Sequence, residues 1–411
     1  MISTETMSKK ASEYISKEDQ YGAHNYHPIP VVIERAEGIF MWDVDGKRYF
    51  DFLSAYSAVN QGHCHPRIID ALTKQAKKLT LTSRAFHNDL LGDYEKFMTE
   101  LFGYDKLLPM NSGAEAVETA LKLCRRWGYD VKGIEENKAK ILVCEGNFHG
   151  RTTGIISFSS DPDSTTGFGP YMPGYEIIPY NDLNALANAL KDNNIAGFLV
   201  EPIQGEAGVF VPDAGYLSGA YELCKAANVL FIGDEIQTGL ARTGKMLCCD
   251  HENVRPDILI LGKALSGGTM PVSAVLADDE IMLTIKPGEH GSTFGGNPLA
   301  CAVAIESMKV LLEEKLADNA DKMGVLLRKG LAELNHPYIK IIRGKGLLNA
   351  IVVEDGYHGK TAWDFCLALK ENGLLAKPTH GDKIRFAPPL VINEAQVNEC
   401  VEIIKNMLEE F

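Results

Sequence analysis

The chain has 411 residues, of which 45% are hydrophobic and 23% are charged, proportions typical of a globular protein with a large apolar core. Its 41 basic and 55 acidic side chains leave a net charge of -14, and an acidic surface counts against general binding to nucleic-acid phosphates. The nine cysteines are scattered and form no C-x-x-C pair, so neither a disulfide framework nor a zinc site is predicted.

The N-terminal residues carry no sign of a targeting segment. The first twenty include four acidic side chains and no apolar run, which counts against a secretory signal and an acid-poor transit peptide. No apolar stretch approaches the about 20 residues that a membrane-spanning helix requires. We therefore expect a cytoplasmic protein, or a mitochondrial matrix protein if a presequence has been removed.

The first predicted element is a β-hairpin over residues 38–53. Apolar and polar side chains alternate there around Asp45-Gly46, a pair suited to the positive φ values of a tight turn. From Pro66 onward the apolar residues follow a helical period, and a proline at the first position of a helix loses no hydrogen bond. A helix is therefore predicted to begin at Pro66.

The tripeptide His63-Cys64-His65, just before this helix, has two interpretations. Two imidazoles on one side of a strand could bind a metal ion, but no carboxylate or further cysteine stands at a suitable spacing. We favour the second interpretation, a structural turn ahead of Pro66.

The middle of the chain alternates short apolar runs with amphipathic helical patterns. Strands are predicted at 106–110, 141–144, 195–200, 229–232 and 258–261, and helices after residue 112 and at 183–190 and 216–227. Runs rich in Val, Ile and Leu are typical of parallel strands that are buried on both faces and joined by helices. The predicted fold class is therefore α/β, with a large domain in which helices flank a mainly parallel sheet.

Beyond residue 300 the pattern becomes a mixture of helices and strands. Helices are predicted at 299–314, 317–334, 363–371 and 394–408, and strands within 339–353 and at 384–386. Such a mixture is typical of a smaller α+β domain. The predicted parts are an N-terminal segment (1–37) that packs with the small domain, a large domain (38–300) and the C-terminal small domain (301–411).

Two predicted strands end in side chains that can carry chemistry. Asp234 follows the apolar run 229–232, and Lys263 follows the run 258–261. The carboxyl ends of parallel strands form the ligand crevice of open α/β sheets. A lysine in a pocket can lose its proton and attack a carbonyl carbon, whereas the same two residues could equally form a buried ion pair. Phosphate-loop, dinucleotide-binding and G-x-S-x-G motifs are absent, which counts against nucleotide hydrolysis, dinucleotide redox chemistry and serine hydrolysis.

The residues around these two side chains form a longer signature. The passages D-E-I-Q-T-G, R-P-D-I and G-K-A-L-S-G-G resemble the cofactor-attachment region of the ornithine/acetylornithine/4-aminobutyrate group of aminotransferases. Similarity to the ornithine-specific members extends over nearly the whole chain, including MNSGAEAVETALKLCRRWGY, VEPIQGEAGV and KPGEHGSTFGGNPL. The resemblance implies the aspartate-aminotransferase-like fold (fold type I), pyridoxal 5'-phosphate as cofactor, and a homodimer with shared active sites.

The resemblance also implies roles in cofactor binding. Lys263 would hold the cofactor and move a proton, Asp234 would pair with its ring nitrogen, and Gln237 would bond its phenolic oxygen. Phe148 would stack on the ring, although an isolated phenylalanine more often belongs to a core. The implied phosphate site consists of Ser112, Gly113 and Ala114 at a helix start, completed by Thr293 from the second subunit.

The implied substrate residues are Tyr26, Tyr56, Arg151, Glu206 and Arg385. With ornithine bound, Tyr26 and Arg151 would hold the α-carboxylate while Glu206 neutralises Arg385. With 2-oxoglutarate bound, Arg385 would leave Glu206 and take the α-carboxylate, since its planar fork can make two parallel hydrogen bonds. Taken alone, each of these charged residues could equally be a solvated surface group or part of a structural ion pair.

The activity implied is transfer of the δ-amino group of L-ornithine to 2-oxoglutarate. Alternatives are an acetylornithine or 4-aminobutyrate aminotransferase and, from another class, a catalytically silent binding or scaffold protein. Tyr26 favours the amino-acid substrate, because its hydroxyl can donate to an α-carboxylate that 4-aminobutyrate lacks. The presence of both Lys263 and Asp234 counts against a silent scaffold. No metal, nucleic-acid partner or membrane partner is expected.

Overall fold

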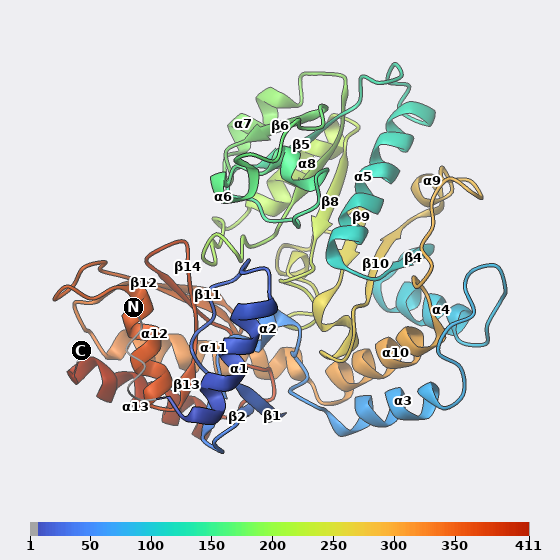
Figure 1. Ribbon diagram of the computed structural model, residues 1–411. Coiled ribbons are helices and arrows are strands. Elements are labelled where there is room, and N and C mark those ends of the chain that lie inside the picture. The colour runs from blue at the N-terminus through green and yellow to red at the C-terminus, as the bar shows by residue number, and fades with distance from the viewer. Residues whose placement is uncertain (1–6, 411) are drawn as a thin grey trace.

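A computed structural model describes residues 7–410, and its centre is a seven-stranded sheet covered by helices (Figure 1). The strand order is β4 (Lys106–Met110), β10 (Ser273–Ala277), β9 (Ile258–Leu261), β8 (Leu230–Asp234), β7 (Ile195–Val200), β5 (Lys140–Cys144) and β6 (Tyr175–Ile178). Only β10 runs against its two neighbours, while the run from β9 to β6 is parallel. The predicted α/β class with a mainly parallel sheet is confirmed.

Side chains on the two faces of each central strand belong to two separate hydrophobic cores. Ile141 and Val143 of β5 join the cluster beneath helix α5 (Gly113–Asp130), and Leu142 joins the cluster beneath α8 (Tyr216–Ala226). Because successive side chains of a strand point to opposite faces, a strand buried on both faces must be apolar throughout. Helix α7 (Leu183–Ala189) contacts α8 on the second face.

A second sheet joins the two ends of the chain. It consists of β1 (Ile33–Glu37), β2 (Phe40–Asp43), β3 (Arg48–Asp51) and the short β13 (Leu374–Leu375). Strands β2 and β3 form the predicted hairpin, with Phe40 opposite Phe50 and Gly46 at a φ of 86° in the turn. The N-terminal helix α1 (Lys9–Tyr21) consequently lies beside the C-terminal elements (Figure 1).

The C-terminal part forms a third, four-stranded sheet packed against helices. Its strands are β11 (Ile339–Lys345), β12 (Leu348–Val353), β15 (Lys383–Phe386) and β14 (Pro378–Thr379). The helices are α10 (Pro298–Glu313), α11 (Leu316–Glu333), α12 (Ala362–Glu371) and α13 (Glu394–Glu410). The predicted elements of this region are present to within about two residues, the usual uncertainty of helix ends.

Several elements were not predicted from the sequence. Besides α1, β1, β6, β10, β13 and β14, they include α2 (Ser54–Ser57), α4 (Leu91–Phe102), α6 (Pro162–Thr165), α9 (Asp279–Met282) and three 3-10 helices, η2 (Ile155–Phe158), η3 (Cys249–Glu252) and η4 (Lys263–Ser266). The helix predicted to begin at Pro66 is confirmed as α3 (Pro66–Ala76), which packs on α10. Among residues 7–410, no helix is long and apolar enough to cross a membrane.

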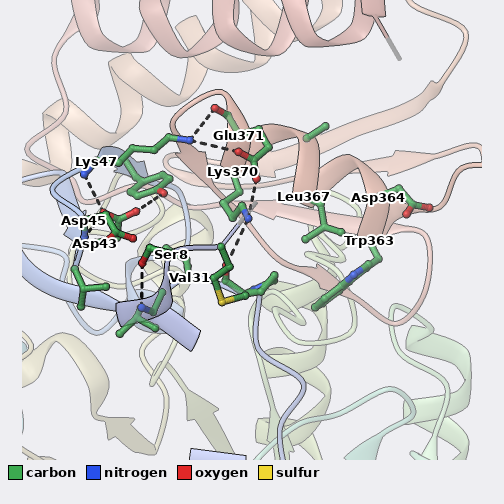
Figure 2. Close-up of a pocket in the computed structure, with 17 residues that line it drawn as sticks. Ser8, Val31, Asp43, Asp45, Lys47, Trp363, Asp364, Leu367, Lys370 and Glu371 are labelled. Carbon is green, nitrogen blue, oxygen red and sulfur yellow. Dashed lines mark hydrogen bonds and ion pairs between the residues drawn. The ribbon is translucent and has the colours of Figure 1, made fainter. Parts of the chain in front are cut away.

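A cavity of about 1080 Å³ separates α1 from α12 and the hairpin turn (Figure 2). Its charged side chains pair with one another, because Glu371 lies 2.8 Å from the ammonium of Lys370 and 3.6 Å from that of Lys47. Tyr49 likewise donates to Asp43 at 2.7 Å. The polar groups of this cavity therefore hold the hairpin and α12 together.

Candidate active site

Both candidate catalytic residues lie at the carboxyl edge of the central sheet. Asp234 is the last residue of β8, and Lys263 begins the short helix that follows β9. Because β8 and β9 are parallel neighbours, both side chains lie at the same edge of the sheet. They line a pocket of about 210 Å³ with four other predicted residues, Gly113, Ala114, Phe148 and Gln237.

The N-terminus of α5 forms one wall of this pocket. Ser112 caps the helix: its hydroxyl accepts the N–H of Glu115 at 3.2 Å, while the Glu115 carboxylate accepts the N–H of Ser112 at 2.7 Å. Free N–H groups and the positive end of the helix dipole favour an anion at such a turn. The wall is tight at Gly113, where a Cβ atom would lie 3.1 Å from Ile236. The turn therefore has the geometry of an anion site, with Ser112 exposed beside it.

Asp234 is buried and held on both carboxylate oxygens. Its Oδ1 accepts the N–H of Ile236 at 3.1 Å, and its Oδ2 lies 2.6 Å from Nδ1 of His149. Burial opposes protonation of His149, but the hydrogen bond and charge of Asp234 outweigh it and raise the pKa of the imidazole. The Nε2 atom of His149 is buried and has no hydrogen-bond partner among residues 7–410. The geometry thus keeps Nδ1 as the donor to Asp234.

Lys263 has the properties of a nucleophilic amine. Burial lowers the pKa of its ammonium, an effect that Glu206 opposes and Arg385 reinforces. Among the described residues no ion pair joins Lys263 to Asp234, whose carboxylate contacts His149 instead. A lowered pKa increases the fraction of the amine that lacks its proton and can attack a carbonyl carbon.

Sequence reasoning did not single out five other residues of the pocket wall. They are His149, Gly150, Glu201, Ile236 and Thr238. The signal that could have found four of them was adjacency, because His149, Gly150, Ile236 and Thr238 stand within two residues of Phe148 or Gln237. Glu201, in contrast, follows the end of β7, and its position at the carboxyl edge of a parallel strand was the available signal.

Glu201 is a buried acid whose protonation affects stability. Its Oε1 accepts the N–H of Phe148 at 2.8 Å. Burial raises its pKa from 4.5 to about 7, because desolvation outweighs the favourable charge of His149. The stabilising contribution of the protonated form is complete below pH 4.5 and is lost as the pH rises through 7.

We expect Glu201→Gln to stabilise the cofactor-free protein at alkaline pH. The amide keeps an acceptor for the N–H of Phe148 and never ionises, so the gain in unfolding free energy should be about 3 kcal/mol at pH 8 and below about 1 kcal/mol at pH 5. Urea unfolding at the two pH values measures it. The control is Glu206→Gln, which should lower the free energy of unfolding at alkaline pH because it removes a carboxylate whose pKa is lowered. A gain in unfolding free energy for Glu201→Gln that does not change with pH would contradict the prediction.

Glu206 and Arg385 meet above the same pocket. Nη1 of Arg385 lies 2.6 Å from Oε1 of Glu206, which also accepts the amide N–H of Gln237 at 3.1 Å. Burial alone would raise the pKa of Glu206, but Arg385 and then Lys263 outweigh it and lower the pKa to about 2. The carboxylate is therefore charged at neutral pH and neutralises the guanidinium. A Cβ atom on Gly205 would overlap Oε1 of Gln237 at 1.5 Å, so only glycine fits beside this amide.

Tyr56 lies beside this ion pair on an unusual stretch of backbone. The centroid of its ring is 5.0 Å from the guanidinium carbon of Arg385. The four residues of α2 all have positive φ, and left-handed backbone costs about 1–2 kcal/mol for each residue other than glycine. Surrounding contacts must hold this turn.

The remaining predicted substrate residues lie nearer the surface. Tyr26 is 70% exposed, and the ammonium of Lys377 is 5.8 Å from its ring centroid. Arg151 donates to the hydroxyl of Ser164 and lies over the ring of Phe148, at 5.4 Å from the centroid. Neither side chain lines the pocket, but Arg151 contacts Phe148, which does.

One predicted cofactor residue does not join the pocket within this chain. Thr293 is exposed and lies beside Thr82 and Arg84 in a separate hollow. The metal interpretation of the tripeptide 63–65 is also not supported, because no cluster of three or more potential ligands occurs among residues 7–410. His63 and His65 bond separate acids instead, Asp51 at 2.7 Å and Glu314 at 3.0 Å.

Known proteins resemble this chain over its whole length. It is 65% identical to "Ornithine aminotransferase, mitochondrial" of Rattus norvegicus, over 98% of this chain and 91% of that protein. A crystal structure of the ornithine aminotransferase of Toxoplasma gondii, described as having partial occupancy of PLP at its active site, matches with a TM-score of 0.96 at 51% identity, over 97% of this chain and 94% of the other. The acetylornithine aminotransferase of Elizabethkingia anophelis matches with a TM-score of 0.90 at 59% identity, over 98% and 99% of the two chains.

The family assignment rests on a match of nearly the same extent. Residues 21–408 fit the family model described as Aminotransferase class-III. These residues include the sheet edge with Asp234 and Lys263, the cap at Ser112 and the pair of Glu206 and Arg385. The chain belongs to the class-III aminotransferase family.

Proposed function

We propose that this enzyme is a pyridoxal-phosphate-dependent aminotransferase that moves the δ-amino group of L-ornithine to 2-oxoglutarate. The products are glutamate 5-semialdehyde, which cyclises to pyrroline-5-carboxylate, and glutamate. The observation that carries the proposal is that Lys263 and Asp234 line one pocket together with Gln237. The amide of Gln237 donates to Glu206, which is paired with Arg385. The residues proposed for the amine chemistry are thus adjacent to an ion pair that can open to bind a carboxylate.

The pocket residues fit the cofactor. The capped turn at Gly113 offers N–H groups to a phosphate, and the buried carboxylate of Asp234 suits a protonated ring nitrogen. The carbonyl oxygen of Gln237 is buried without a partner among the described residues, which leaves this amide able to serve a polar group of a ligand. Bound there, pyridoxal phosphate supplies an electron sink for the bond that breaks at the substrate carbon.

Each side chain of the pocket has its own proposed role in the reaction. Lys263 holds the cofactor until substrate arrives and afterwards, as a free amine, carries a proton to and from the reacting carbon. Asp234 stabilises positive charge at the ring nitrogen, and His149 fixes the orientation of that carboxylate. Phe148 covers the pocket and excludes water.

We propose that Glu206 switches Arg385 between the two substrates. While the pair is closed, Arg385 is neutralised and the amine end of ornithine can approach, with Tyr26 and Arg151 on its α-carboxylate. When the pair opens, Arg385 receives the α-carboxylate of 2-oxoglutarate in a two-pronged hydrogen bond. The closed state is supported by the 2.6 Å distance between Arg385 and Glu206.

The proposed assembly is a homodimer with shared active sites. Thr293, exposed and outside the pocket of its own chain, is proposed to complete the phosphate site of the second subunit. The proposed parts of each subunit are the segment 1–37, a large domain over 38–300 and a small domain over 301–411. For the compartment we propose the cytoplasm, with the mitochondrial matrix as the alternative that the name of the rat relative suggests.

An absorbance experiment tests the proposed reaction. The purified protein, loaded with pyridoxal phosphate, is mixed with L-ornithine, N-acetylornithine or 4-aminobutyrate in the absence of a keto acid. Ornithine is expected to bleach the visible band of the lysine-bound cofactor fastest, and 2-oxoglutarate should restore it. If only one of the other two amines bleaches the band, the substrate assignment is wrong.

Acetylornithine is the second candidate, because a structure at 59% identity carries that name. The two candidate substrates differ at the α-amino group, which is free in ornithine and acylated in N-acetylornithine. A catalytically silent scaffold would show no band that responds to any amine. The lowered pKa of Lys263 and the buried Asp234 count against that alternative.

A further inference from the structure

The turn that carries Tyr56 requires an explanation for its conformation. Four successive residues, none of them glycine, have left-handed φ values: 49° at Ser54, 44° at Ala55, 62° at Tyr56 and 74° at Ser57. Chains avoid such a run because Cβ crowds the following carbonyl. A strained segment of this kind persists only where its surroundings fix it, and such segments concentrate at functional sites.

Asp51 fixes the start of the turn. It is 2% exposed at the end of β3, and its Oδ1 accepts the N–H of Leu53 at 2.8 Å and of Ser54 at 2.9 Å. Its Oδ2 lies 2.7 Å from Nε2 of His63. His63 is itself anchored through its backbone, which exchanges hydrogen bonds of 2.8 and 3.0 Å with Gly38. Both oxygens of the carboxylate are therefore occupied, one by the turn and one by an anchored imidazole.

The other end of this contact chain is the substrate pocket. The ring of Tyr56 lies against Arg385, and its backbone carbonyl accepts the amide N–H of Gln237 at 3.4 Å. Arg385 in turn bonds Glu206. A shift of the turn would therefore move the wall beside the arginine that is proposed to distinguish the two substrates.

We infer that Asp51 and His63 are positioning residues for substrate recognition, acting through the left-handed turn 54–57 and Tyr56. This inference rests on the proposed function for the identity of the substrate. It assigns a role to one residue of the tripeptide 63–65: the imidazole of His63 orients the Asp51 carboxylate, and the carboxylate holds the turn that presents Tyr56.

His65 provides a matched control within the same tripeptide. Its Nε2 bonds Glu314, at the C-terminal cap of α10, at 3.0 Å. Its side chain is 13% exposed and that of His63 is 15% exposed, so truncating either removes an equally covered imidazole, although Glu314 is 37% exposed and Asp51 only 2%. Only the contact made by His63 leads to Tyr56.

The test is a double-variant cycle on the cofactor-loaded enzyme. His63→Ala is expected to raise the KM for ornithine about tenfold, as the loss of one charge-assisted hydrogen bond would, with a smaller effect on kcat. In a Tyr56→Ala background the same substitution should change KM less than about twofold, because the residue it acts through is gone. His65→Ala should leave KM unchanged. An equal effect of His63→Ala in both backgrounds, or an equal effect of His65→Ala, would overturn the inference.

A rescue variant separates positioning from general loss of stability. Ala55 is exposed, and glycine adopts positive φ without strain, so His63→Ala combined with Ala55→Gly should recover most of the KM while Tm stays low. Recovery of Tm without KM would contradict the proposed route through the turn. Failure of the proposed function would be detected separately, because the absorbance band of the wild-type enzyme would then not respond to ornithine. In that case the double-variant cycle is measured with the amine that does bleach the band.

Discussion

Lys263→Ala is expected to lower kcat by at least about 10⁴-fold, the upper end of the range for loss of a positioned acid–base group. The loss is large because one amine performs two tasks, holding the cofactor and moving the proton at the reacting carbon. The variant should still bind pyridoxal phosphate through the turn at Gly113 and through Asp234. Its spectrum should be that of the free aldehyde, and ornithine should change it slowly. Stopped-flow absorbance measures both effects.

Lys132→Ala is the matched control for this experiment. Burial lowers the pKa of Lys132 as well, but its ammonium donates to the carbonyl of Ile195 at 2.6 Å, outside the pocket. The control should lose stability and keep its absorbance band and rate. If Lys263→Ala retained the lysine-bound spectrum, another amine would hold the cofactor, and the assignment of this role to Lys263 would be wrong.

The fold was predictable where local pattern and burial agree. Strands β7, β8 and β9 are buried at every residue, and apart from Asp234 at the end of β8 their sequences contain only apolar residues and glycine. Strand β10 (Ser273–Ala277) is equally buried, but its five residues contain three alanine or serine side chains and carry little strand preference. Its place between β9 and β4 depends on partners far away in the sequence, which a local pattern does not reveal.

The site was predictable to the extent that its residues stand in continuous motifs. Asp234 ends β8, Gln237 follows it by three residues, and Lys263 follows β9 by two. Because these strands are parallel neighbours, the topology alone brings the three residues to one edge. The hydrogen bond between His149 and Asp234 spans 85 residues, and no spacing rule indicates it. Sequence reasoning identified Phe148 and passed over the histidine next to it.

Buried polar residues outside the motifs were the hardest to interpret. Arg242 stands just outside the motif D-E-I-Q-T-G, yet its guanidinium is fully buried and donates to the carbonyls of Leu347 and Pro388. Burial lowers the pKa of this arginine to about 9. Leu347 and Pro388 belong to the C-terminal part of the chain, and the guanidinium also donates to Asn60 at 2.6 Å. The arginine thus joins segments that are far apart in the sequence, which is a property of tertiary structure.

Asp234→Ala is expected to reduce kcat by about 10²–10⁴-fold, because it removes one partner of a buried charged pair, a loss of about 3–5 kcal/mol. Without the carboxylate the ring nitrogen of the cofactor loses its proton at neutral pH, and electron withdrawal weakens. The dissociation constant of pyridoxal phosphate should rise in parallel. Equilibrium titration of the cofactor and single-turnover kinetics with ornithine measure the two effects independently.

His149 offers the variants that separate charge from orientation. Asparagine places an amide N–H near the position of Nδ1, whereas glutamine places it near Nε2, the atom that has no partner among the described residues. His149→Asn should therefore retain most of the cofactor affinity, and His149→Gln should lose about tenfold, the value of one charge-assisted hydrogen bond. Equal losses in the two variants would mean that the imidazole serves packing against Phe158 rather than orientation of the carboxylate. If Asp234→Ala shows the full loss of activity and His149→Asn retains the cofactor affinity, the enzyme requires a carboxylate that is held in one orientation, at the edge of the sheet where β8 ends.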